Sequence, residues 1–482
     1  MNVFNSFINK YKKMPAAAKA SLWFVICGFV QRGISTITTP IFTRILDTTD
    51  YGIYSVFNSW LEIITIIATL RFCYGVYVKG LVKYSEDQDR FSSSLLGLTT
   101  CWIGLFFLIY YPFRSFWNGI FGLSTVLMMC MFAIMLSVSA FDFWATRERN
   151  LFRYKNLVKL TLAVAILNPS IGVVAVLMMK GSKADARIIS LAIIQFVIYI
   201  FLYVKIMIKG KTFYNKEYWK YALVFNIPLV PHFLSQFILN HSDRLMINQM
   251  VGVSEAGIYS LAYSIAAILS MLNTSIENSL RPWVFQKIKA GESNKIQTVS
   301  IGALILVAIS NLILIAFAPE IVRIFAPEAY QGAIDVIPPI TMGIFFAFIY
   351  NIFVDVEMYY AKTRAVMIAS TAGAFLNLVL NYIFIQKFGY QAAAYTTLIS
   401  YMFIAILHYI FMNNVVKKYA NNEKIYEVKY IVLISFVFIL IGCLFAVLKN
   451  HLIIRIVMIG LLGLLVYYDK NRIVSLYKTV KK

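Results

Sequence analysis

The chain has 482 residues, of which 60% are hydrophobic and only 14% are charged. Water-soluble domains of this total size need a larger charged surface, so the composition excludes an ordinary soluble enzyme and indicates a protein embedded in lipid. The 44 basic residues exceed the 22 acidic ones by 22. Such an excess is typical either of nucleic-acid binding or of membrane proteins with basic cytoplasmic loops.

Long apolar stretches, separated by short polar turns, follow one another along the sequence. A helix needs about 20 apolar residues to cross the hydrocarbon layer, and on this length we predict an all-α integral membrane protein with fourteen spans. The predicted limits are 20–40, 52–78, 93–112, 122–143, 160–179, 188–204, 221–240, 256–280, 299–318, 334–354, 365–385, 391–411, 430–448 and 452–469. The first span is too long for a cleaved signal peptide, and we expect it to be retained.

The basic residues are unevenly divided between the two sets of connections. With the N-terminus inside, 32 of the 44 lie in inner segments, ten lie in outer turns and two lie within spans. Short cytoplasmic loops carry such an excess, so we expect both termini in the cytoplasm and no nucleic-acid partner. The connections are too short for a soluble domain, so we expect the function to reside within the bilayer.

One short pattern recurs at an offset of 205 residues. Gly-Ile-Tyr-Ser follows the first span at 52–55 and the seventh span at 257–260, as expected for two parallel repeats. We therefore predict two pseudo-symmetric six-helix lobes around a central cavity, with two further helices. The predicted divisions are 1–19 (basic cytoplasmic N-terminus), 20–220 (first lobe, spans 1–6), 221–411 (second lobe, spans 7–12), 412–469 (spans 13 and 14) and 470–482 (basic cytoplasmic tail).

Two arginines lie inside predicted spans, Arg32 in the first and Arg71 in the second, at depths compatible with one shared site. A charge in the middle of a bilayer costs about 3 kcal/mol or more unless it faces water or a partner. Because a guanidinium offers forked donors to phosphoryl oxygens, both arginines are candidates for binding a phosphate or diphosphate. The alternative is an ion pair with Glu62, although a nine-residue separation places Glu62 and Arg71 on opposite faces of a continuous helix.

Other polar residues within spans leave two interpretations open. Glu277 and Arg281 lie four residues apart on one helix face, which would allow an internal ion pair. The other interpretation makes Glu62 or Glu277 a proton or sodium site that couples transport to an ion gradient. For Asn377 and Asn381 in the eleventh span, the favoured interpretation is that their amides hold neighbouring helices together.

The seventh predicted span is unusually polar. Pro228 and Pro231 remove helical hydrogen bonds and predict a kink or hinge. Pro228, His232, Gln236 and Asn240 recur every four residues and share one helix face. His232, Gln236 and Asn240 are therefore candidates for contacting a hydroxyl-rich ligand, although such stripes also join helices. A lone histidine without acidic or histidine partners is not a metal site.

Several patterns that would indicate an enzyme are missing from the sequence. It has no P-loop and no loop-borne cluster of acidic residues and histidines. The five cysteines lie in apolar runs without paired spacing, so we expect them to be reduced and structural. These observations predict a transporter that is not an enzyme and that uses no metal or other cofactor.

Several segments carry a family resemblance. Residues 40–46, followed by 50–55, resemble the hallmark of Wzx-type polysaccharide repeat-unit flippases, which belong to the multidrug/oligosaccharidyl-lipid/polysaccharide exporter superfamily. Three further regions resemble this family in the expected order. They are Ser242-Asp243-Arg244, residues 327–330, and residues 377–381 leading to 388–394. Together these segments cover most of the chain.

The resemblance implies two six-helix bundles in a bacterial cytoplasmic membrane and a transport task. The substrate would be an undecaprenyl-diphosphate-linked oligosaccharide, moved from the inner to the outer leaflet for capsule, O-antigen or exopolysaccharide synthesis by alternating access. In related flippases, arginines of the first two helices line a cationic cavity, and Arg32 and Arg71 occupy such helices here. A polymerase and glycosyltransferases of the same pathway would be partners, along with membrane lipid.

Three alternatives remain at this point. A multidrug cation antiporter of the same superfamily would suit twelve spans and an acidic cavity better than fourteen spans with buried arginines. A membrane-embedded polysaccharide polymerase would be expected to carry large outer loops, whereas the outer turns here are short. An exporter of the lipid precursor of peptidoglycan or teichoic acid would share the mechanism and differ only in the sugar.

Overall fold

The computed structural model describes residues 14–419 and 424–468, and every regular element in these ranges is a helix. The helices are α2 (Ala16–Ile45), α3 (Thr48–Thr69), α4 (Val76–Lys83), α5 (Gln88–Tyr110), α6 (Arg114–Phe121), α7 (Thr125–Asn150), α8 (Tyr154–Met178), α9 (Lys183–Gly210), α10 (Lys216–Asn226), η1 (Ile227–Leu229), α11 (Val230–Met250), α12 (Val253–Lys289), α13 (Ser293–Ala316), α14 (Ala318–Phe325), η2 (Glu328–Tyr330), α15 (Ala333–Tyr359), α16 (Thr363–Phe388), α17 (Ala392–Tyr419), α18 (Val428–Val447) and α19 (Leu452–Tyr468). The predicted tail, 470–482, and most of the predicted segment 1–19 lie outside the described residues.

The predicted spans correspond to these helices one by one. Twelve of the described helices are long and apolar enough to cross a membrane. The seventh predicted span is a further candidate, because α10 and α11 pass the same test together as one broken helix. The fourteenth corresponds to α19, whose apolar part, Leu452–Leu464, is shorter. The prediction of an all-helical membrane protein is confirmed.

The chain divides into two compact units, Met1–Leu234 and Ser235–Lys482. This division lies inside the seventh span, whereas the sequence analysis placed the lobe boundary after residue 220. The difference arises because α10 packs on α4 and α5 of the first unit. There the Tyr218 hydroxyl donates to Asp87 Oδ2 at 2.8 Å, and the Trp219 indole donates to the Ser94 carbonyl at 2.9 Å.

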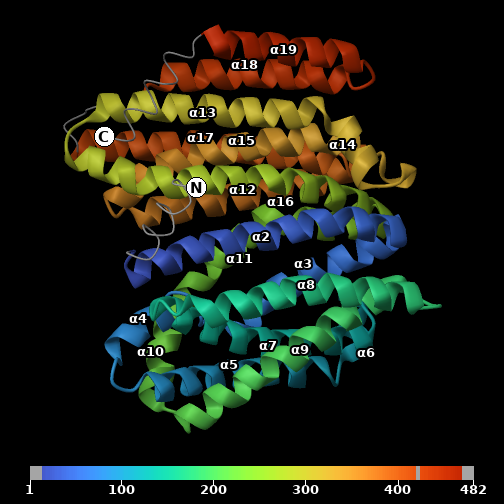
Figure 1. The fold of residues 1–482 in the computed structure, drawn as a ribbon, viewed down its shortest axis with the longest axis vertical. Coiled ribbons are helices and arrows are strands. Elements are labelled where there is room, and N and C mark those ends of the chain that lie inside the picture. Colours follow the sequence, from blue (N-terminus) through green and yellow to red (C-terminus); the bar gives the residue numbers. More distant parts are fainter. Residues whose placement is uncertain (1–13, 420–423, 469–482) are drawn as a thin grey trace, which may run out of the picture. The chain divides into compact units, whose positions relative to one another are not determined.

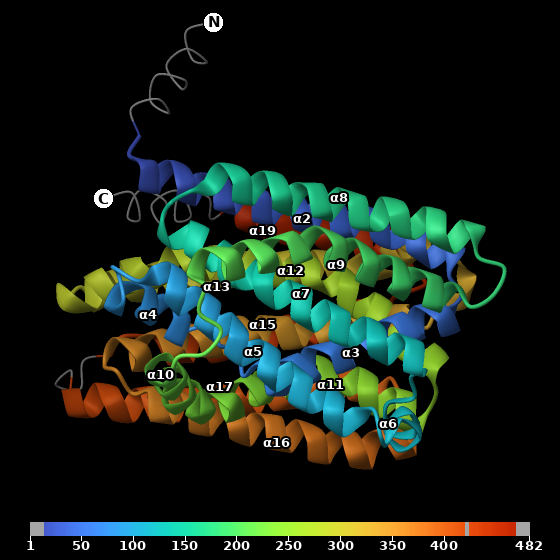
Figure 2. The ribbon, with the colours of Figure 1, turned by 90° about the horizontal axis from the view of Figure 1, so that it is seen from below.

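In the first unit, α9 packs against α3, α5, α7 and α8 (Figure 1). α2 lies along α8, as Figure 2 shows. The spans of α2 and α8 are the least buried in the described part of this unit. Both helices therefore leave a long face exposed, which is the physical reason that α2 can carry a charged residue without burying it.

In the second unit, α15 is buried between α12, α13 and α17. Its middle part, residues 337–350, is almost entirely apolar, as expected for a helix enclosed by others. α18 and α19 pack on α13, and α18 also contacts α15 (Figure 1). The rings of Phe345 and Phe438 stack there at 4.0 Å between centroids. The two helices predicted as an addition to the lobes therefore form part of the second compact unit.

The last helix is attached by a buried ion pair. Arg455 of α19 is 1% exposed, and its Nη1 and Nη2 atoms lie 2.8 and 2.7 Å from the two carboxylate oxygens of Glu320 in α14. Two parallel donors of this kind match a carboxylate well. The Arg455 guanidinium also lowers the pKa of Glu320, which lies outside the spans. α19 is therefore fixed to the second unit although its apolar length is short.

The two units repeat the same packing. α7 and α8 each pack on α9 in the first unit, as α15 and α16 each pack on α17 in the second. The Gly-Ile-Tyr-Ser copies occupy equivalent positions near the starts of α3 and α12, each beginning at the fifth residue of its helix. Four residues after each copy, Ser59 Oγ donates to the Ser55 carbonyl at 3.0 Å, and Ser264 Oγ donates to the Ser260 carbonyl at 2.9 Å. The predicted internal repeat is therefore supported by structure as well as by sequence.

A close approach between α5 and the segment after α9 gives a first testable prediction. A Cβ atom added to Gly97 would lie 2.2 Å from the backbone carbonyl oxygen of Phe213. Gly97→Ala is expected to lower the melting temperature in detergent, because overpacking of this kind costs about 1–3 kcal/mol. Gly104→Ala on the same helix is the control, since nothing lies within 4 Å of the position that its new methyl group would take. Equal melting temperatures for both variants would contradict the close approach.

Candidate functional site

The second predicted span is interrupted at Arg71. α3 ends at Thr69, and Leu70 and Arg71 adopt left-handed backbone conformations with φ of 46° and 45°. The side-chain amide of Asn226 donates to the Leu70 carbonyl at 2.7 Å and holds this segment in place. Such a conformation costs a non-glycine residue about 1–3 kcal/mol. The surrounding packing therefore imposes the interruption.

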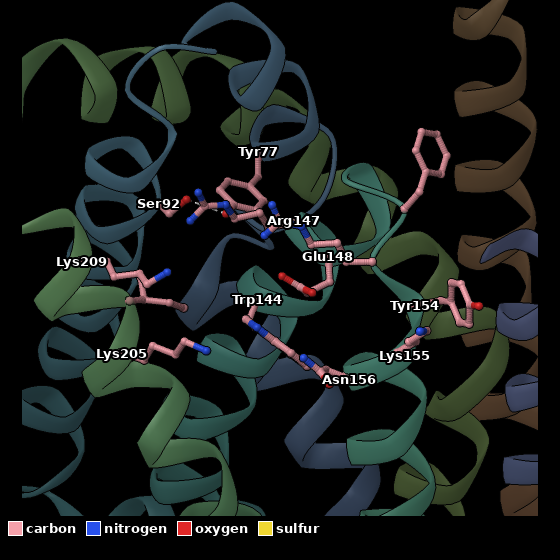
Figure 3. A pocket seen from close by; sticks show the side chains of 13 residues that line it. Tyr77, Ser92, Trp144, Arg147, Glu148, Tyr154, Lys155, Asn156, Lys205 and Lys209 are labelled. Atoms are coloured by element: carbon pink, nitrogen blue, oxygen red, sulfur yellow. Dashed lines mark hydrogen bonds between the residues drawn. The ribbon is translucent and has the colours of Figure 1, made fainter. Parts of the chain in front are cut away.

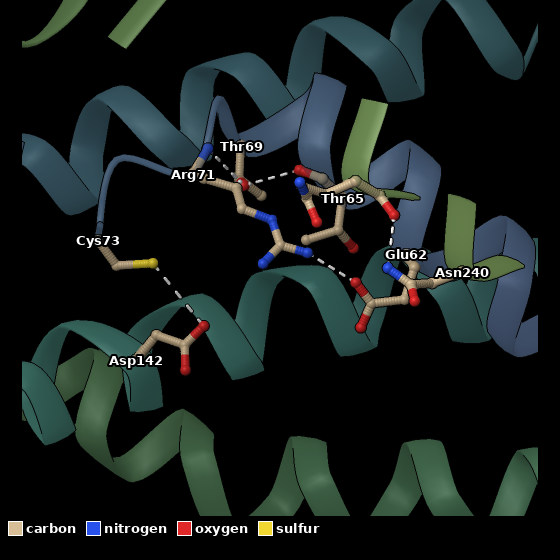
Figure 4. Close-up of polar contacts among 8 residues, drawn as sticks. Glu62, Thr65, Thr69, Arg71, Cys73, Asp142 and Asn240 are labelled. Carbon is tan, nitrogen blue, oxygen red and sulfur yellow. Dashed lines mark hydrogen bonds and ion pairs between the residues drawn. The ribbon is translucent and has the colours of Figure 1, made fainter. Parts of the chain in front are cut away.

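The interruption brings Arg71 back to Glu62, contrary to the prediction. Arg71 Nη2 lies 2.6 Å from Glu62 Oε2 (Figure 4). The expectation that the two side chains lie on opposite faces was wrong, because the helix that it assumed ends between them. The side chains of Arg71 and Glu62 are 24% and 48% exposed. A partly exposed pair contributes at most about 1 kcal/mol, so another anion can replace Glu62 at small cost.

Arg71 and Glu62 line a cavity of about 320 Å³ inside the first unit. Asp142 also lines this cavity and accepts a weak hydrogen bond from Cys73 Sγ at 3.8 Å (Figure 4). Further polar groups in the lining come from Thr65, Thr69 and Gln195. The Arg71 Nε atom is buried and has no hydrogen-bond partner among the described residues. The guanidinium therefore keeps unused donor capacity in a polar cavity.

Asp142 is a candidate residue that the sequence analysis missed. It lies in α7 between Phe141 and Phe143, inside the predicted span 122–143. The rule that selected Glu62 and Glu277, an ionisable residue within an apolar span, would have found it. With Asp142, the cavity holds two carboxylates beside one guanidinium. It is therefore less cationic than the family resemblance led us to expect.

Arg32 lies in α2 of the same unit, with an exposed side chain. Its backbone carbonyl accepts a hydrogen bond from Thr36 Oγ1 at 2.9 Å. Within the described part of the chain, the Arg32 guanidinium makes no ion pair. The alternative in which Arg32 pairs with Glu62 is therefore not observed, because Arg71 takes that carboxylate. Arg32 does not line the cavity around Arg71.

The seventh span breaks where its prolines predicted a kink. Pro228 lies in the 3₁₀ turn η1, between α10 and α11. Gln236 and Asn240 lie in regular helix, where Asn240 Nδ2 donates to the Gln236 carbonyl at 2.7 Å. The Tyr401 hydroxyl donates to Asn240 Oδ1 at 3.3 Å. The side chain of His232 lies outside the described part of the structure, so its predicted role stays a prediction.

Arg281 pairs with a carboxylate that the sequence analysis did not consider. Arg281 Nε lies 2.5 Å from Asp355 Oδ1 of α15. Glu277 instead accepts a hydrogen bond from Asn351 Nδ2 at 3.0 Å. The local interpretation, an ion pair between Glu277 and Arg281, is therefore wrong for the described structure. One neighbouring helix, α15, supplies both partners, since it packs against α12.

The amides of Asn377 and Asn381 join helices, as predicted. Asn381 Nδ2 donates to Asp243 Oδ1 at 2.6 Å, and Asn377 Nδ2 donates to Thr397 Oγ1 at 3.0 Å. Thr397 Oγ1 in turn donates to Asp243 Oδ2 at 2.9 Å. This network connects α11, α16 and α17 around one buried carboxylate.

The family comparison matches more than half of the chain. Residues 17–288 match the family described as polysaccharide biosynthesis protein, and residues 228–383 match the MatE family. An uncharacterised membrane protein of Haemophilus influenzae is 21% identical over 287 residues, which are 57% of this chain. The chain spans 66% of that relative's length.

Solved structures share the fold. A lipid II flippase, MurJ, in an inward closed conformation has a TM-score of 0.69 and 16% identity, covering 93% of this chain and 98% of its own. An inward-facing multidrug resistance transporter of the MATE family has a TM-score of 0.60 and 12% identity, covering 82% of this chain and 96% of its own. At these identities the similarity shows the fold alone, which the chain shares with a lipid flippase and a multidrug transporter.

Proposed function

The chain belongs to the polysaccharide biosynthesis protein family, and we propose that it is a flippase for undecaprenyl-diphosphate-linked oligosaccharide repeat units. It would move them from the inner to the outer leaflet of the bacterial cytoplasmic membrane by alternating access. The observation that carries this proposal is Arg71, a guanidinium in a polar cavity at the break between α3 and α4, held by one partly exposed ion pair. The flippase-like fold supports the same task.

The chemistry of the substrate fits an exchangeable arginine. A diphosphate and sugars need a wet, polar path, whereas a prenyl tail is most stable in lipid. Arg71 has an orphaned Nε donor and a carboxylate partner of low affinity. We propose that the diphosphate replaces Glu62 on Arg71, because phosphoryl oxygens accept two donors from one guanidinium. No bond of the substrate is broken in this process.

Arg32, Gln236, Asn240 and His232 are assigned to the same path as proposed contacts for the diphosphate or the sugars. Arg32 is exposed and unpaired in the described structure, and Asn240 is exposed. The break at Pro228 and Pro231 is proposed as the hinge of alternating access. A polymerase and glycosyltransferases of the same pathway are the proposed partners, and both chain termini are proposed to be cytoplasmic.

Coupling to a proton or sodium gradient also stays a proposal. Glu62 and Asp142 line the cavity beside Arg71, so protonation of either carboxylate would change how strongly Arg71 is held. Glu277 is a separate candidate in the second unit, with one amide partner. Release of the diphosphate from Arg71 would then accompany binding of a proton or cation to these carboxylates. Movement of the lipid-linked substrate would thereby be coupled to movement of the ion.

A specific observation favours a second candidate, export of cationic drugs. The cavity around Arg71 holds two carboxylates, and the fold is shared with multidrug transporters. A transport assay with the protein reconstituted in vesicles distinguishes the flippase from the drug exporter. We expect it to move a fluorescent undecaprenyl-diphosphate oligosaccharide between leaflets and not to move ethidium. Ethidium transport without movement of the lipid-linked sugar would favour the exporter and overturn the flippase proposal.

A further inference from the structure

A second cavity lies in the first unit, separate from the one around Arg71. It measures about 490 Å³ and shares no lining residue with the Arg71 cavity. Its charged lining consists of Arg147, Glu148, Arg153, Lys155, Lys205 and Lys209 (Figure 3). These residues belong to the last turns of α7 and α9 and to the start of α8. This end of the unit carries the basic connections that we predict to be cytoplasmic.

The charges around this cavity are unbalanced. Five cationic side chains face one lining carboxylate, that of Glu148. Arg147 pairs with Asp89 of α5. None of the other four cations forms an ion pair within the described ranges. Membrane orientation requires only that the cytoplasmic loops contain basic residues. It does not explain why these residues gather around one cavity.

Part of the cavity wall is buried and well packed. Tyr77 and Ser92 are buried, and their hydroxyls are hydrogen-bonded at 2.7 Å. The Tyr77 ring packs edge-on against Phe143 with centroids 4.8 Å apart. Arg147 also pairs with Asp89, in a partly exposed ion pair of the same kind as Arg71–Glu62. The buried Tyr77–Ser92 pair therefore gives the cavity one well-packed wall behind its exposed lysines.

The rim is shaped by a tight turn between α7 and α8. Phe152 has a left-handed backbone with φ of 53°, and the Arg153 amide donates back to the Glu148 carbonyl at 2.8 Å. Arg153 and Lys155 follow this turn and line the cavity. Figure 3 shows Lys155 across the cavity from Lys205 and Lys209. Cations thus come from two opposed walls, which suits a compact anion held between them.

An apolar stripe on α9 continues from the basic residues. Phe201, Val204 and Ile208 follow one another at helical spacing and are 71%, 47% and 66% exposed. Lys205 and Lys209 lie directly beside this stripe on the same helix. Trp144 and Tyr154, residue types typical of the membrane interface, also line the cavity. A basic cavity beside an exposed apolar stripe suits an anionic head group that is joined to an acyl chain.

We propose that this cavity binds the phosphate-bearing head group of an anionic phospholipid, with an acyl chain along Phe201, Val204 and Ile208. Basic pockets between helices on the cytoplasmic side are suited to such head groups. A free phosphate compound would use the same cations, but it would gain nothing from the apolar stripe. The site lies apart from the proposed transport cavity, and this inference does not depend on the proposed function.

The test uses the full chain purified in a neutral detergent. Its melting temperature is titrated with a short-chain phosphatidylglycerol, the matching phosphatidylcholine and inorganic pyrophosphate. We expect phosphatidylglycerol to stabilise the protein and phosphatidylcholine not to do so. Lys205→Ala/Lys209→Ala is expected to weaken the apparent affinity for phosphatidylglycerol about 30-fold, because each basic residue near an anionic head group contributes about a factor of five.

Lys417→Ala/Lys418→Ala, at the exposed end of α17, is the matched control and should keep the wild-type affinity. Both double variants should melt at the wild-type temperature without lipid, since all four lysines are exposed. Stabilisation by pyrophosphate with no response to phosphatidylglycerol would assign the site to a soluble phosphate and overturn the lipid assignment. Equal phosphatidylglycerol affinity in wild type and the Lys205/Lys209 variant would overturn the site itself.

Discussion

Replacing Arg71 by alanine is expected to slow movement of the lipid-linked oligosaccharide by about 10- to 100-fold. A hydrogen bond to a charged group contributes about 1.5–3 kcal/mol, and Arg71 is the only cation that lines its cavity among the described residues. Loss of the guanidinium also leaves Glu62 and Asp142 facing an anionic diphosphate. The measurement is leaflet exchange of a fluorescent undecaprenyl-diphosphate oligosaccharide in vesicles that contain equal amounts of folded protein.

Two companion variants separate binding from packing. Arg71→Lys keeps the charge but loses the forked donors, so we expect an intermediate rate. Glu62→Gln removes the resident anion, and we expect the lipid-linked substrate to bind more tightly because it no longer displaces a carboxylate. If Arg71→Ala flips the substrate at the wild-type rate, Arg71 is not a substrate contact. An unchanged substrate affinity in Glu62→Gln would show that no exchange takes place.

The membrane architecture could be predicted from the sequence because lipid imposes a simple rule. Backbone polar groups inside the hydrocarbon must be paired, so a crossing segment is helical wherever it faces lipid, and breaks occur only where protein or a cavity covers them. The fourteen apolar stretches therefore map onto helices, including the proline-broken seventh span. The lobe boundary was less accurate. Whether α10 packs with the first or the second unit depends on contacts such as Tyr218 to Asp87, which hydropathy does not encode.

The candidate site was predicted less completely, for two physical reasons. Leu70 and Arg71 take left-handed conformations without a glycine or proline at either position, so the sequence around them reads as uninterrupted helix. Arg281 has a carboxylate four residues away, but its partner Asp355 is 74 residues distant. Sequence spacing shows which residues share one face of a helix. It does not show which residues of a neighbouring helix will pair with them. Asn377 and Asn381 were predicted correctly because a buried amide must find partners somewhere.

Asp243→Ala is expected to destabilise the second unit strongly. The carboxylate is 1% exposed and accepts hydrogen bonds from Asn381, Thr397 and the Tyr259 hydroxyl, the last at 2.5 Å. Alanine would leave the buried Tyr259 and Thr397 hydroxyls without this acceptor, and Asn381 Nδ2 would keep only Asn377 Oδ1 at 3.2 Å. Each orphaned donor costs about 1–3 kcal/mol. For a unit of this size, we expect the melting temperature to fall by about 10 °C or more. The fall in melting temperature is measured by thermal unfolding of the purified variant in detergent.

Asp335→Ala provides the comparison, because it also removes a carboxylate from a helix of the second unit. Asp335 is 40% exposed and pairs with Lys449, which is 39% exposed, so water can replace the lost contact. The melting temperature of Asp335→Ala should stay within about 2 °C of the wild type, since partly exposed ion pairs contribute little to stability. Asp243→Asn should fall between the two, because one oxygen remains as an acceptor while the new amide faces hydroxyl donors. Matching melting temperatures for Asp243→Ala and Asp335→Ala would mean that the network around Asp243 does not hold α11, α16 and α17 together.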